Sequence, residues 1–403
     1  MRVHGQLGKN SHLATHLTKR QTTLMDALKR KPDINFAAGP AKLPVPVIEK
    51  ARSELPFYDG LGISVMEMGH RSTDYAQLNK KVEDSVRRLM DVPENYKVLF
   101  MSGGGTGQFA GVPLNLMGRN AANPSADYVV TGNWSAKAAK EAEKYGKVNL
   151  VFPKPKTFST IPDQETWTLN PDASYVYYCA NETALGIEFP YVPDTGDVPI
   201  VCDMSSNIFT RKVDVSKFGV IFAGAQKNIG CAGVTLVIVR EDLLGLALPV
   251  CPSVFDYKVT ADNKSAYNTP PVWNIYIMGL VFDWIEEQGG VEAMALNCQA
   301  KSGLIYSTIE QFKDVYFPTI DTKEHRSRMN VTFRIGSAEG NENLEKQFLA
   351  DSQARGMISL KGYRLVGGIR VSLYNAMTVD EVRVFIRFMK EFGERVRQMT
   401  PMP

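Results

Sequence analysis

Seven short apolar runs recur between residues 95 and 240, and they limit the fold more than any other feature of the chain. Each run is three to six residues long and often β-branched, without the apolar–polar alternation of a half-exposed strand. Such runs are typical of strands that are buried on both faces. The runs are Val98–Met101, Tyr128–Val130, Val148–Phe152, Tyr175–Cys179, Ile200–Cys202, Val220–Phe222 and Val234–Val239.

Helical patterns lie before and between these runs. Asp74–Met90 carries apolar residues at spacings of three and four, and Ser135–Tyr145 is a second helical segment. Buried strands that alternate with helices predict an open, mostly parallel sheet flanked by helices, which is the α/β fold class. The 403 residues are enough for two domains.

The pattern changes after about residue 290. Met329–Ile335 and Ile369–Leu373 alternate apolar with polar residues, as strands with one solvent-exposed face do. Thr378 and Glu381 have the spacing of a capping box, and an amphipathic helical pattern follows them. This region is predicted to form a smaller C-terminal α+β domain.

Composition excludes several classes of protein. No apolar run approaches the ~18 residues that a transmembrane helix needs, so no membrane protein is predicted. The net charge is +3, and the chain beyond residue 31 is slightly acidic, which argues against a nucleic-acid-binding surface. The five cysteines have no CxxC spacing and lie mostly in apolar segments. They are interpreted as buried thiols in a reducing compartment, and no metal site is predicted.

Residues 1–31 differ from the rest of the chain. They hold seven basic residues and one acid, Asp26, and they lack the apolar core of a secretory signal. A basic, hydroxyl-rich and acid-poor composition is typical of an organelle transit peptide, and an irregular N-terminal extension is the alternative. The protein is therefore predicted to be cytoplasmic, or mitochondrial or plastid-located if residues 1–31 are a transit peptide.

Chemically active residues follow directly after several of the runs, where open α/β sheets bind their ligands. A glycine-rich loop from Ser102 to Gln108 can present backbone N–H groups to an anion at a helix N-terminus. Trp134 follows a second run. Asp203 and Lys227 follow two others, where a charge is costly to bury unless it is paired or covalently engaged. Taken singly, the loop could be a flexible turn and Trp134 a core residue.

Together these features meet the requirements of pyridoxal phosphate. The loop suits the cofactor's phosphate and Trp134 its ring, Asp203 suits the pyridine nitrogen, and Lys227 suits the Schiff base. The order along the chain agrees, with Lys227 placed 24 residues after Asp203. The residues predict a pyridoxal-phosphate-dependent enzyme.

Longer strings point to one family. The strings Ala225–Gly230 (AQKNIG) and Gly367–Ala376 (GGIRVSLYNA) are the most specific. Others are Phe36–Pro44, Met68–Ser72, Gly103–Phe109, Gly132–Ser135 and Tyr267–Pro271. From about residue 33 to its end, the chain resembles the phosphoserine aminotransferase family, class V aminotransferases of fold type I.

The resemblance implies a domain organisation. A large pyridoxal-phosphate-binding domain is expected over residues 47–290, with a mostly parallel sheet, and a small α+β domain over residues 291–403. Residues 32–46 are expected to form an arm that packs with the small domain, and residues 1–31 lie outside the resemblance.

The resemblance also implies a role for individual residues. Lys227 and Asp203 would be the catalytic residues, as Schiff-base lysine and partner of the pyridine nitrogen. Trp134 would stack on the ring, and Thr183 would contact its hydroxyl region. The cofactor phosphate would be held by Gly105, Thr106 and Gln226, and by Asn268 and Thr269 of a second subunit. The substrate would be bound by His70, Arg71, Tyr363, Arg364 and Arg370.

The implied function is reversible transamination between O-phospho-L-serine/3-phosphohydroxypyruvate and L-glutamate/2-oxoglutarate, in L-serine biosynthesis, by a homodimer with shared active sites. Each substrate has an α-carboxylate, assigned to Arg370, and a distal anion, assigned to the other substrate-binding residues. Two separated arginine sites suit that shape. The chain has Thr106 where relatives often have Arg or Cys, and Tyr363 where they have His, so the substrate phosphate loses a cation at each place.

Three other functions compete with this one. A second class V activity, such as serine–glyoxylate transamination, is the nearest alternative. Cysteine desulfuration needs a mobile catalytic cysteine, whereas the cysteines here lie mainly in strand-like or helical segments. A catalytically idle binding homologue is opposed by the presence of both Lys227 and Asp203.

Overall fold

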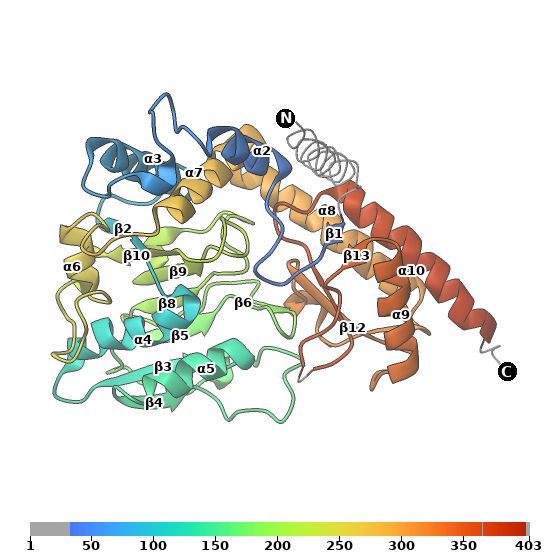
Figure 1. Cartoon of the computed structure of the whole chain (residues 1–403). Helices are drawn as coiled ribbons and strands as arrows, with labels where there is room; N and C mark the ends of the chain where they lie inside the picture. Colours follow the sequence, from blue (N-terminus) through green and yellow to red (C-terminus); the bar gives the residue numbers. More distant parts are fainter. Residues whose placement is uncertain (1–32, 365, 400–403) are drawn as a thin grey trace, which may run out of the picture. The chain divides into compact units, whose positions relative to one another are not determined.

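The computed structural model describes residues 33–364 and 366–399 (Figure 1). The chain divides into two units, residues 1–34 and residues 35–403. Only Asp33 and Ile34 of the first unit are described, and the second unit carries the fold. The expectation of an extension or transit peptide over residues 1–31 lies outside the described residues.

A seven-stranded sheet has the order β2-β10-β9-β8-β5-β3-β4. Its strands are β2 (Tyr96–Met101), β3 (Ser125–Val129), β4 (Lys147–Leu150), β5 (Val176–Cys179), β8 (Ile200–Asp203), β9 (Val220–Gly224) and β10 (Thr235–Arg240). Neighbours from β9 to β4 pair in parallel, and β10 runs antiparallel to both β2 and β9. Each apolar run thus contributes one strand, and the predicted mostly parallel α/β sheet is confirmed.

Helices cover both faces of this sheet (Figure 1). Tyr177 on β5 faces the core formed with α4 (Gly104–Leu116) and α5 (Asn133–Ala142). The next residue, Tyr178, faces the core formed with α3 (Thr73–Met90) and α7 (Val272–Glu287). Because successive side chains point to opposite faces and both are covered, the inner strands have no polar alternation. The expectation of burial on both faces is wrong for edge strand β4, where Lys147 and Leu150 are exposed. Two further helices are α2 (Val45–Glu54) and α6 (Tyr257–Asp262).

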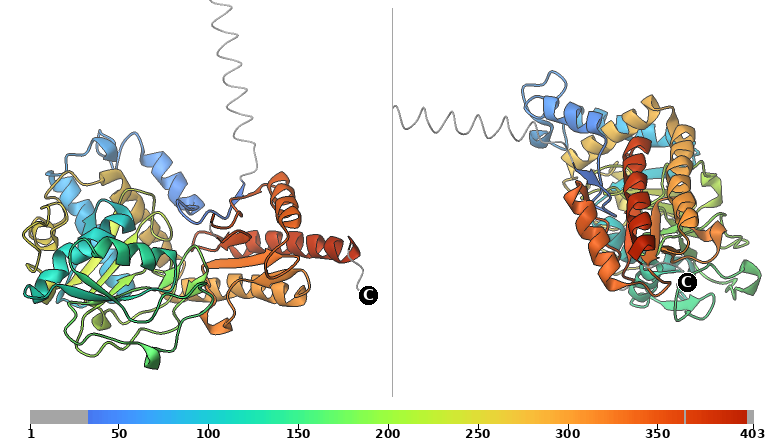
Figure 2. Two further views of the ribbon diagram at one scale, coloured as in Figure 1. Left: turned by 90° about the horizontal axis from the view of Figure 1, so that it is seen from below. Right: turned by 90° about the vertical axis from the view of Figure 1, so that its right-hand side faces the viewer.

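The C-terminal part contains a three-stranded antiparallel sheet in the order β11-β12-β14. Figure 2 shows the helices of this part gathered around the sheet. The strands are β11 (Tyr316–Pro318), β12 (Asn330–Ile335) and β14 (Ile369–Ser372), and the helices are α8 (Gly290–Gln311), α9 (Glu342–Ala354) and α10 (Val379–Met399). The predicted capping box is confirmed: Thr378 N–H donates to Glu381, and Glu381 N–H donates to Thr378 Oγ1.

The expectation of a solvent-exposed face on β12 is wrong, because Asn330 and Thr332 are buried. They contact a hairpin formed by β6 (Asn181–Glu182) and β7 (Ile187–Glu188). Asn181 Nδ2 donates to Asn330 Oδ1 at 2.8 Å, and Thr332 Oγ1 donates to the Leu185 carbonyl at 2.7 Å. Asn330 and Thr332 therefore face the β6–β7 hairpin and not solvent. The division at residues 47–290 and 291–403 stays a prediction.

An extended arm follows β1 (Ile34–Asn35). Phe36 N–H donates to the carbonyl of Ile358 on β13 (Met357–Ile358), and its ring lies 5.0 Å from that of Phe385. Further along, Ala41 N–H donates to the Gln226 carbonyl at 2.9 Å. The arm thus reaches from the C-terminal helices to the loop that carries Lys227. Within the described residues, no helix is both long and apolar enough to cross a membrane.

Candidate active site

The loops at the carboxyl ends of the parallel strands bring together three of the residues singled out in the sequence. Lys227, which follows β9, donates from Nζ to Oγ1 of Thr183 at 2.6 Å. The same Nζ lies 5.7 Å from the centroid of the Trp134 ring. Trp134 is in the first turn of α5, directly after β3. An amine, a hydroxyl and an aromatic plate therefore meet at one edge of the sheet.

Lys227 and Asp203 influence each other's ionisation. Burial lowers the pKa of Lys227, and the carboxylate of Asp203 partly offsets that effect. Burial raises the pKa of Asp203, and the nearby Lys227 partly offsets it. A lysine with a lowered pKa has more of the neutral amine, which is the nucleophilic form.

Asp203 has one oxygen committed within the protein and one available. Oδ1 accepts the Ser205 N–H at 2.9 Å. Across the part of the chain that the structure describes, no hydrogen bond is made to Oδ2, and this atom is not fully enclosed by protein. An accessible oxygen on a nearly buried carboxylate suits a cationic N–H group, which would lower the pKa of Asp203 again.

The glycine-rich loop forms the N-terminus of α4. Gly103 (φ 98°) and Gly104 (φ 63°) adopt left-handed backbone conformations that favour glycine. No side chain caps this helix, so its first N–H groups are available to an anion. A Cβ added to Gly105 would lie 3.6 Å from Ser205 Oγ, which places this turn beside the end of β8, and Thr106 is exposed. Gln226 is half-buried beside the arm, next to Lys227.

Arg370 is a half-buried cation on β14. Its Nε is buried without a hydrogen-bond partner among the described residues, and burial lowers the pKa of its guanidinium. None of the carboxylates that the structure describes lies within ion-pairing distance of it. Its charge is near enough to Lys227 to lower the pKa of that lysine. An arginine in this state is suited to an anionic ligand.

The other predicted site residues make fewer contacts with this group, although Tyr363 is near enough to Arg370 to affect the pKa of its guanidinium. Arg71 is exposed just before α3, with His70 half-buried beside it, and Arg364 is exposed beside the half-buried Tyr363. Asn268 and Thr269 are exposed in the loop before α7. Among the described residues, none of these six donates to or accepts from Lys227, Asp203 or Trp134.

One buried residue at the site was given no role from the sequence. Glu182 accepts hydrogen bonds from the backbone of Trp134 and Ser135. The only signal for it was its position in Asn181–Thr183, directly after a buried strand.

The residues present fit pyridoxal phosphate. Trp134 Nε1 is buried with no hydrogen-bond partner in the described part of the chain, so its surroundings leave a donor for a ligand. The amine of Lys227, the available oxygen of Asp203 and the uncapped N-terminus of α4 match the cofactor's aldehyde, ring nitrogen and phosphate. The structure describes no group of three or more His, Cys, Asp or Glu side chains that could hold a metal ion.

Comparison with known proteins agrees with this chemistry. The family model "Aminotransferase class-V" matches residues 34–385. A phosphoserine aminotransferase of Drosophila melanogaster is 56% identical over 360 residues, which cover 89% of this chain and 98% of that protein. A phosphoserine aminotransferase of Pseudomonas aeruginosa is 51% identical over 359 residues, which cover 89% and 97%.

Solved structures give the same result. The phosphoserine aminotransferase from Bacillus circulans subsp. alkalophilus superimposes with a TM-score of 0.87 at 40% identity, covering 91% of this chain and all of that one. A pyridoxal-phosphate-bound phosphoserine aminotransferase from Trichomonas vaginalis has a TM-score of 0.85 at 38% identity, covering 89% of this chain and 99% of that one.

Proposed function

Because the chain belongs to the class V aminotransferase family, we propose that the site around Lys227 performs its amino transfer. The protein is a pyridoxal-phosphate-dependent aminotransferase that interconverts O-phospho-L-serine and 3-phosphohydroxypyruvate, with L-glutamate and 2-oxoglutarate as the second pair, in L-serine biosynthesis. The observation that carries the assignment to this site is the meeting of Lys227 Nζ with Thr183 and the Trp134 ring.

Pyridoxal phosphate, when bound, supplies a carbonyl carbon that condenses with amines and a ring that withdraws electrons. Lys227 would hold it covalently through Nζ, and Asp203 would accept a hydrogen bond from the ring nitrogen. Trp134 would pack on the ring, and Thr183 would keep Nζ oriented. Its phosphate would lie at Gly105, Thr106 and Gln226.

Lys227 Nζ would also carry the proton that is moved during amino transfer. Burial lowers the pKa of Nζ, so this amine would give up and take back a proton more readily than an exposed lysine does. Thr183 Oγ1, which accepts a hydrogen bond from Nζ, would limit the directions in which that amine can point.

Recognition of the substrates would be divided between two cationic places. Arg370 would bind the α-carboxylate, since its guanidinium is half-buried and has no carboxylate partner among the described residues. Arg71 and Arg364, with His70 and Tyr363, would bind the distal phosphate or γ-carboxylate. Bidentate pairing of guanidinium with either anion is the physical basis.

We propose further that the active form is a homodimer with shared sites. Large apolar side chains are exposed close together in sequence on α2 and the segment after it: Val45, Ile48, Leu55, Phe57, Ile63 and Met66. Exposed apolar surface of this extent is typical of an interface. Arg71 follows this segment, and Asn268 and Thr269 follow the exposed Tyr267. In a dimer these residues would complete the partner's phosphate and substrate sites.

The proposed location is the cytoplasm. Transport to a mitochondrion or plastid is the alternative, if residues 1–31 act as a transit peptide. Fusing these residues to a fluorescent protein tests this directly, because a transit peptide would carry the fusion into the organelle.

Covalent labelling tests the site. Borohydride reduction of the cofactor-loaded protein should fix a pyridoxyl group on Lys227, and Lys227→Ala should fold but lose transamination of phosphoserine. Lys301, which is also buried but donates to the carbonyls of Tyr374 and Met377, is an internal control. A label that maps to Lys301 or to another lysine would overturn the assignment.

A further inference from the structure

Glu182 is a buried carboxylate whose hydrogen bonds all go to one helical turn. Its side chain has no exposure to solvent. Oε2 accepts the Trp134 N–H at 3.0 Å, and Oε1 accepts the Ser135 N–H at 2.8 Å and the Ser135 hydroxyl at 2.6 Å. Both oxygens are therefore committed to the first turn of α5, which carries Trp134.

The first turn of α5 has no local cap. Its N-cap residue is Gly132, which has no side chain, so an acceptor for the first N–H groups must come from elsewhere. Glu182 supplies it from β6, with its charge at the positive end of the helix dipole. The hydroxyl of Ser135 extends the same group of contacts, since it accepts the N–H of Thr131 and of Gly132, each at 3.1 Å.

Glu182 packs so closely against this turn that a side chain at position 132 would have no room. A Cβ added to Gly132 would lie 2.4 Å from Glu182 Cδ. The backbone of Gly132 is extended (φ −177°), a conformation that any residue adopts. The glutamate, and not backbone strain, is therefore what makes glycine necessary at position 132.

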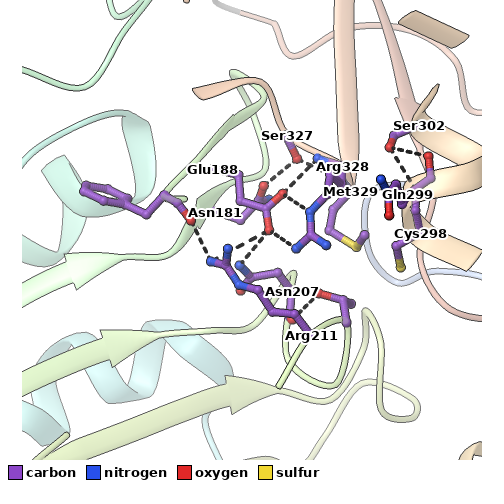
Figure 3. A network of polar contacts seen from close by, with 12 residues as sticks. Asn181, Glu188, Asn207, Arg211, Cys298, Gln299, Ser302, Ser327, Arg328 and Met329 are labelled. Atoms are coloured by element: carbon purple, nitrogen blue, oxygen red, sulfur yellow. Dashed lines mark hydrogen bonds and ion pairs between the residues drawn. The ribbon is translucent and has the colours of Figure 1, made fainter. Parts of the chain in front are cut away.

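Both neighbours of Glu182 are also held. Asn181 Nδ2 donates to Asn330 Oδ1 and to Ser206 Oγ, each at 2.8 Å, and Figure 3 shows Asn181 in the buried network that includes Ser327. On the other side, Thr183 accepts the hydrogen bond from Lys227. The backbone at Glu182 is thus fixed relative to Lys227, and the carboxylate transmits that fixed position to Trp134.

We propose that Glu182 is a positioning residue for the cofactor, which sets the plane of the Trp134 ring relative to Lys227 by holding the backbone of Trp134 and Ser135. This role rests on the proposed function, in which the Trp134 ring packs on pyridoxal phosphate. Glu182 would act through Trp134, because both of its oxygens accept hydrogen bonds from Trp134 and Ser135.

The test measures cofactor binding, not turnover. Glu182→Gln keeps the shape of the side chain but replaces one acceptor oxygen with a donor, which then faces an N–H of α5. The dissociation constant for pyridoxal phosphate, measured by equilibrium dialysis of the full chain, should rise at least about tenfold (about 1.4 kcal/mol). Quenching of tryptophan fluorescence by bound cofactor should weaken as well, and Trp134→Phe identifies the part of that quenching that belongs to Trp134.

Two further variants separate positioning from stability. Gly132→Ala displaces the Glu182 carboxylate without removing its charge, so it should weaken cofactor binding in the same direction. Asp127→Asn is the matched control. Asp127 is an equally buried carboxylate on β3 that accepts hydrogen bonds from Asn170 N–H (2.6 Å) and Asn149 Nδ2 (2.9 Å). Asp127→Asn should lower thermal stability and leave the cofactor dissociation constant unchanged.

The outcomes are distinct. If Glu182→Gln and Gly132→Ala bind pyridoxal phosphate as tightly as the unmodified chain, the positioning role is wrong while the proposed function stands. If Asp127→Asn weakens binding as much as Glu182→Gln does, the effect is a loss of stability and the role is again overturned. If Glu182→Gln does not fold, Gly132→Ala decides. Failure of the unmodified chain to bind pyridoxal phosphate at all would refute the proposed function itself.

Discussion

Three charged side chains near the site, Lys227, Asp203 and Arg370, are buried or half-buried without the partners that such charges usually have. Lys227 donates to a neutral hydroxyl, Asp203 keeps one oxygen without a partner, and Arg370 has a buried Nε without an acceptor, among the residues described. Charges of this kind cost free energy unless they are paired. Under the proposed function, cofactor and substrate would supply the missing partners, and the site would thereby select an anionic amino acid.

Asp203→Asn tests the residue that is proposed to bind the ring nitrogen. An amide does not keep that nitrogen protonated, so the ring withdraws electrons less well. We expect the variant to bind pyridoxal phosphate but to lose at least about a hundredfold in kcat, or about 3 kcal/mol of barrier. The measurement is single-turnover transamination at saturating cofactor. A near-normal kcat would exclude Asp203 as the partner of the ring nitrogen.

Arg370 and Arg364 are predicted to serve different ends of the substrate. Arg370→Ala should lower kcat/KM for glutamate and phosphoserine alike, by roughly ten- to a hundredfold, because a buried charge-assisted hydrogen bond contributes ~1.5–3 kcal/mol. Arg364→Ala should lower kcat/KM for phosphoserine far more than for alanine, which has no distal anion. Equal losses for phosphoserine and alanine would remove Arg364 from the phosphate site.

At the scale of single residues, the sequence reveals those site residues that lie at or just after the end of a buried strand. Asp203 follows an apolar run directly, and Trp134 and Lys227 follow their runs within five residues, where a charged or aromatic residue is conspicuous. Glu182 ends a strand as well, yet nothing in the sequence links it to Trp134, 48 residues earlier. Because the donor is a backbone N–H, the type of residue that donates it gives no sign of this hydrogen bond in the sequence.

At the scale of elements, the β6–β7 hairpin joins the two sheets. Figure 3 shows Glu188, on β7, between Arg328 and Arg211. Arg328 donates to both Glu188 oxygens, at 2.8 Å from its terminal nitrogen and 3.3 Å from Nε, and Arg211 lies at 4.0 Å. Burial raises the pKa of Glu188, but the two arginines outweigh it and the net pKa is lowered. This ion pair therefore connects the β6–β7 hairpin to the segment that leads into β12.

Arg328→Met tests this connection. It leaves the buried Glu188 carboxylate with Arg211 as its nearest cation, at 4.0 Å, and with neutral donors from Asn207 and the backbone of residue 328. Such a loss costs about 3–5 kcal/mol of unfolding free energy. Because the pKa of Glu188 is lowered in the folded protein, its stabilising effect is present above the ordinary glutamate pKa and is lost as pH falls through the lowered value. The stability gap between variant and unmodified protein should thus be largest near pH 7 and narrow in acid.

The matched control is Arg383→Met. Arg383 pairs with Asp380 at 2.8 Å on the exposed face of α10, and exposed pairs contribute at most ~1 kcal/mol. Urea unfolding of both variants between neutral and acid pH makes the comparison. A cost for Arg328→Met no larger than that for Arg383→Met would mean that the hairpin is held by its other contacts.

The strands of the large sheet were predictable because burial on both faces needs only local apolar residues. The second face of β12 was not, because its polar residues are satisfied by a hairpin about 150 residues away in the chain. Asn330 and Thr332 look like solvent-facing residues until their partners are known. Alternation in a sequence shows only which side chains of a strand are polar. Such a side chain can be satisfied by water or by a buried polar contact, and the sequence does not distinguish the two.

At the scale of the whole molecule, assembly and cofactor binding should be linked. If Asn268 and Thr269 complete the partner's phosphate site, dissociation into single chains should release pyridoxal phosphate. We expect cofactor occupancy to fall with dilution along the same curve as dimer content, measured by analytical ultracentrifugation with absorbance detection of the cofactor. A single chain that keeps the cofactor as tightly as the dimer would refute the shared site.

The contacts of the arm determine when, during synthesis of the chain, the surroundings of Lys227 can be completed. Ala38, near its start, accepts a hydrogen bond from the hydroxyl of Tyr374 at 2.7 Å, and Ala41 bonds to the residue before Lys227. Tyr374 lies 336 residues after Ala38 in the chain, so this contact can form only after that whole stretch has been synthesised. The surroundings of Lys227 therefore stay incomplete until Tyr374 has been made.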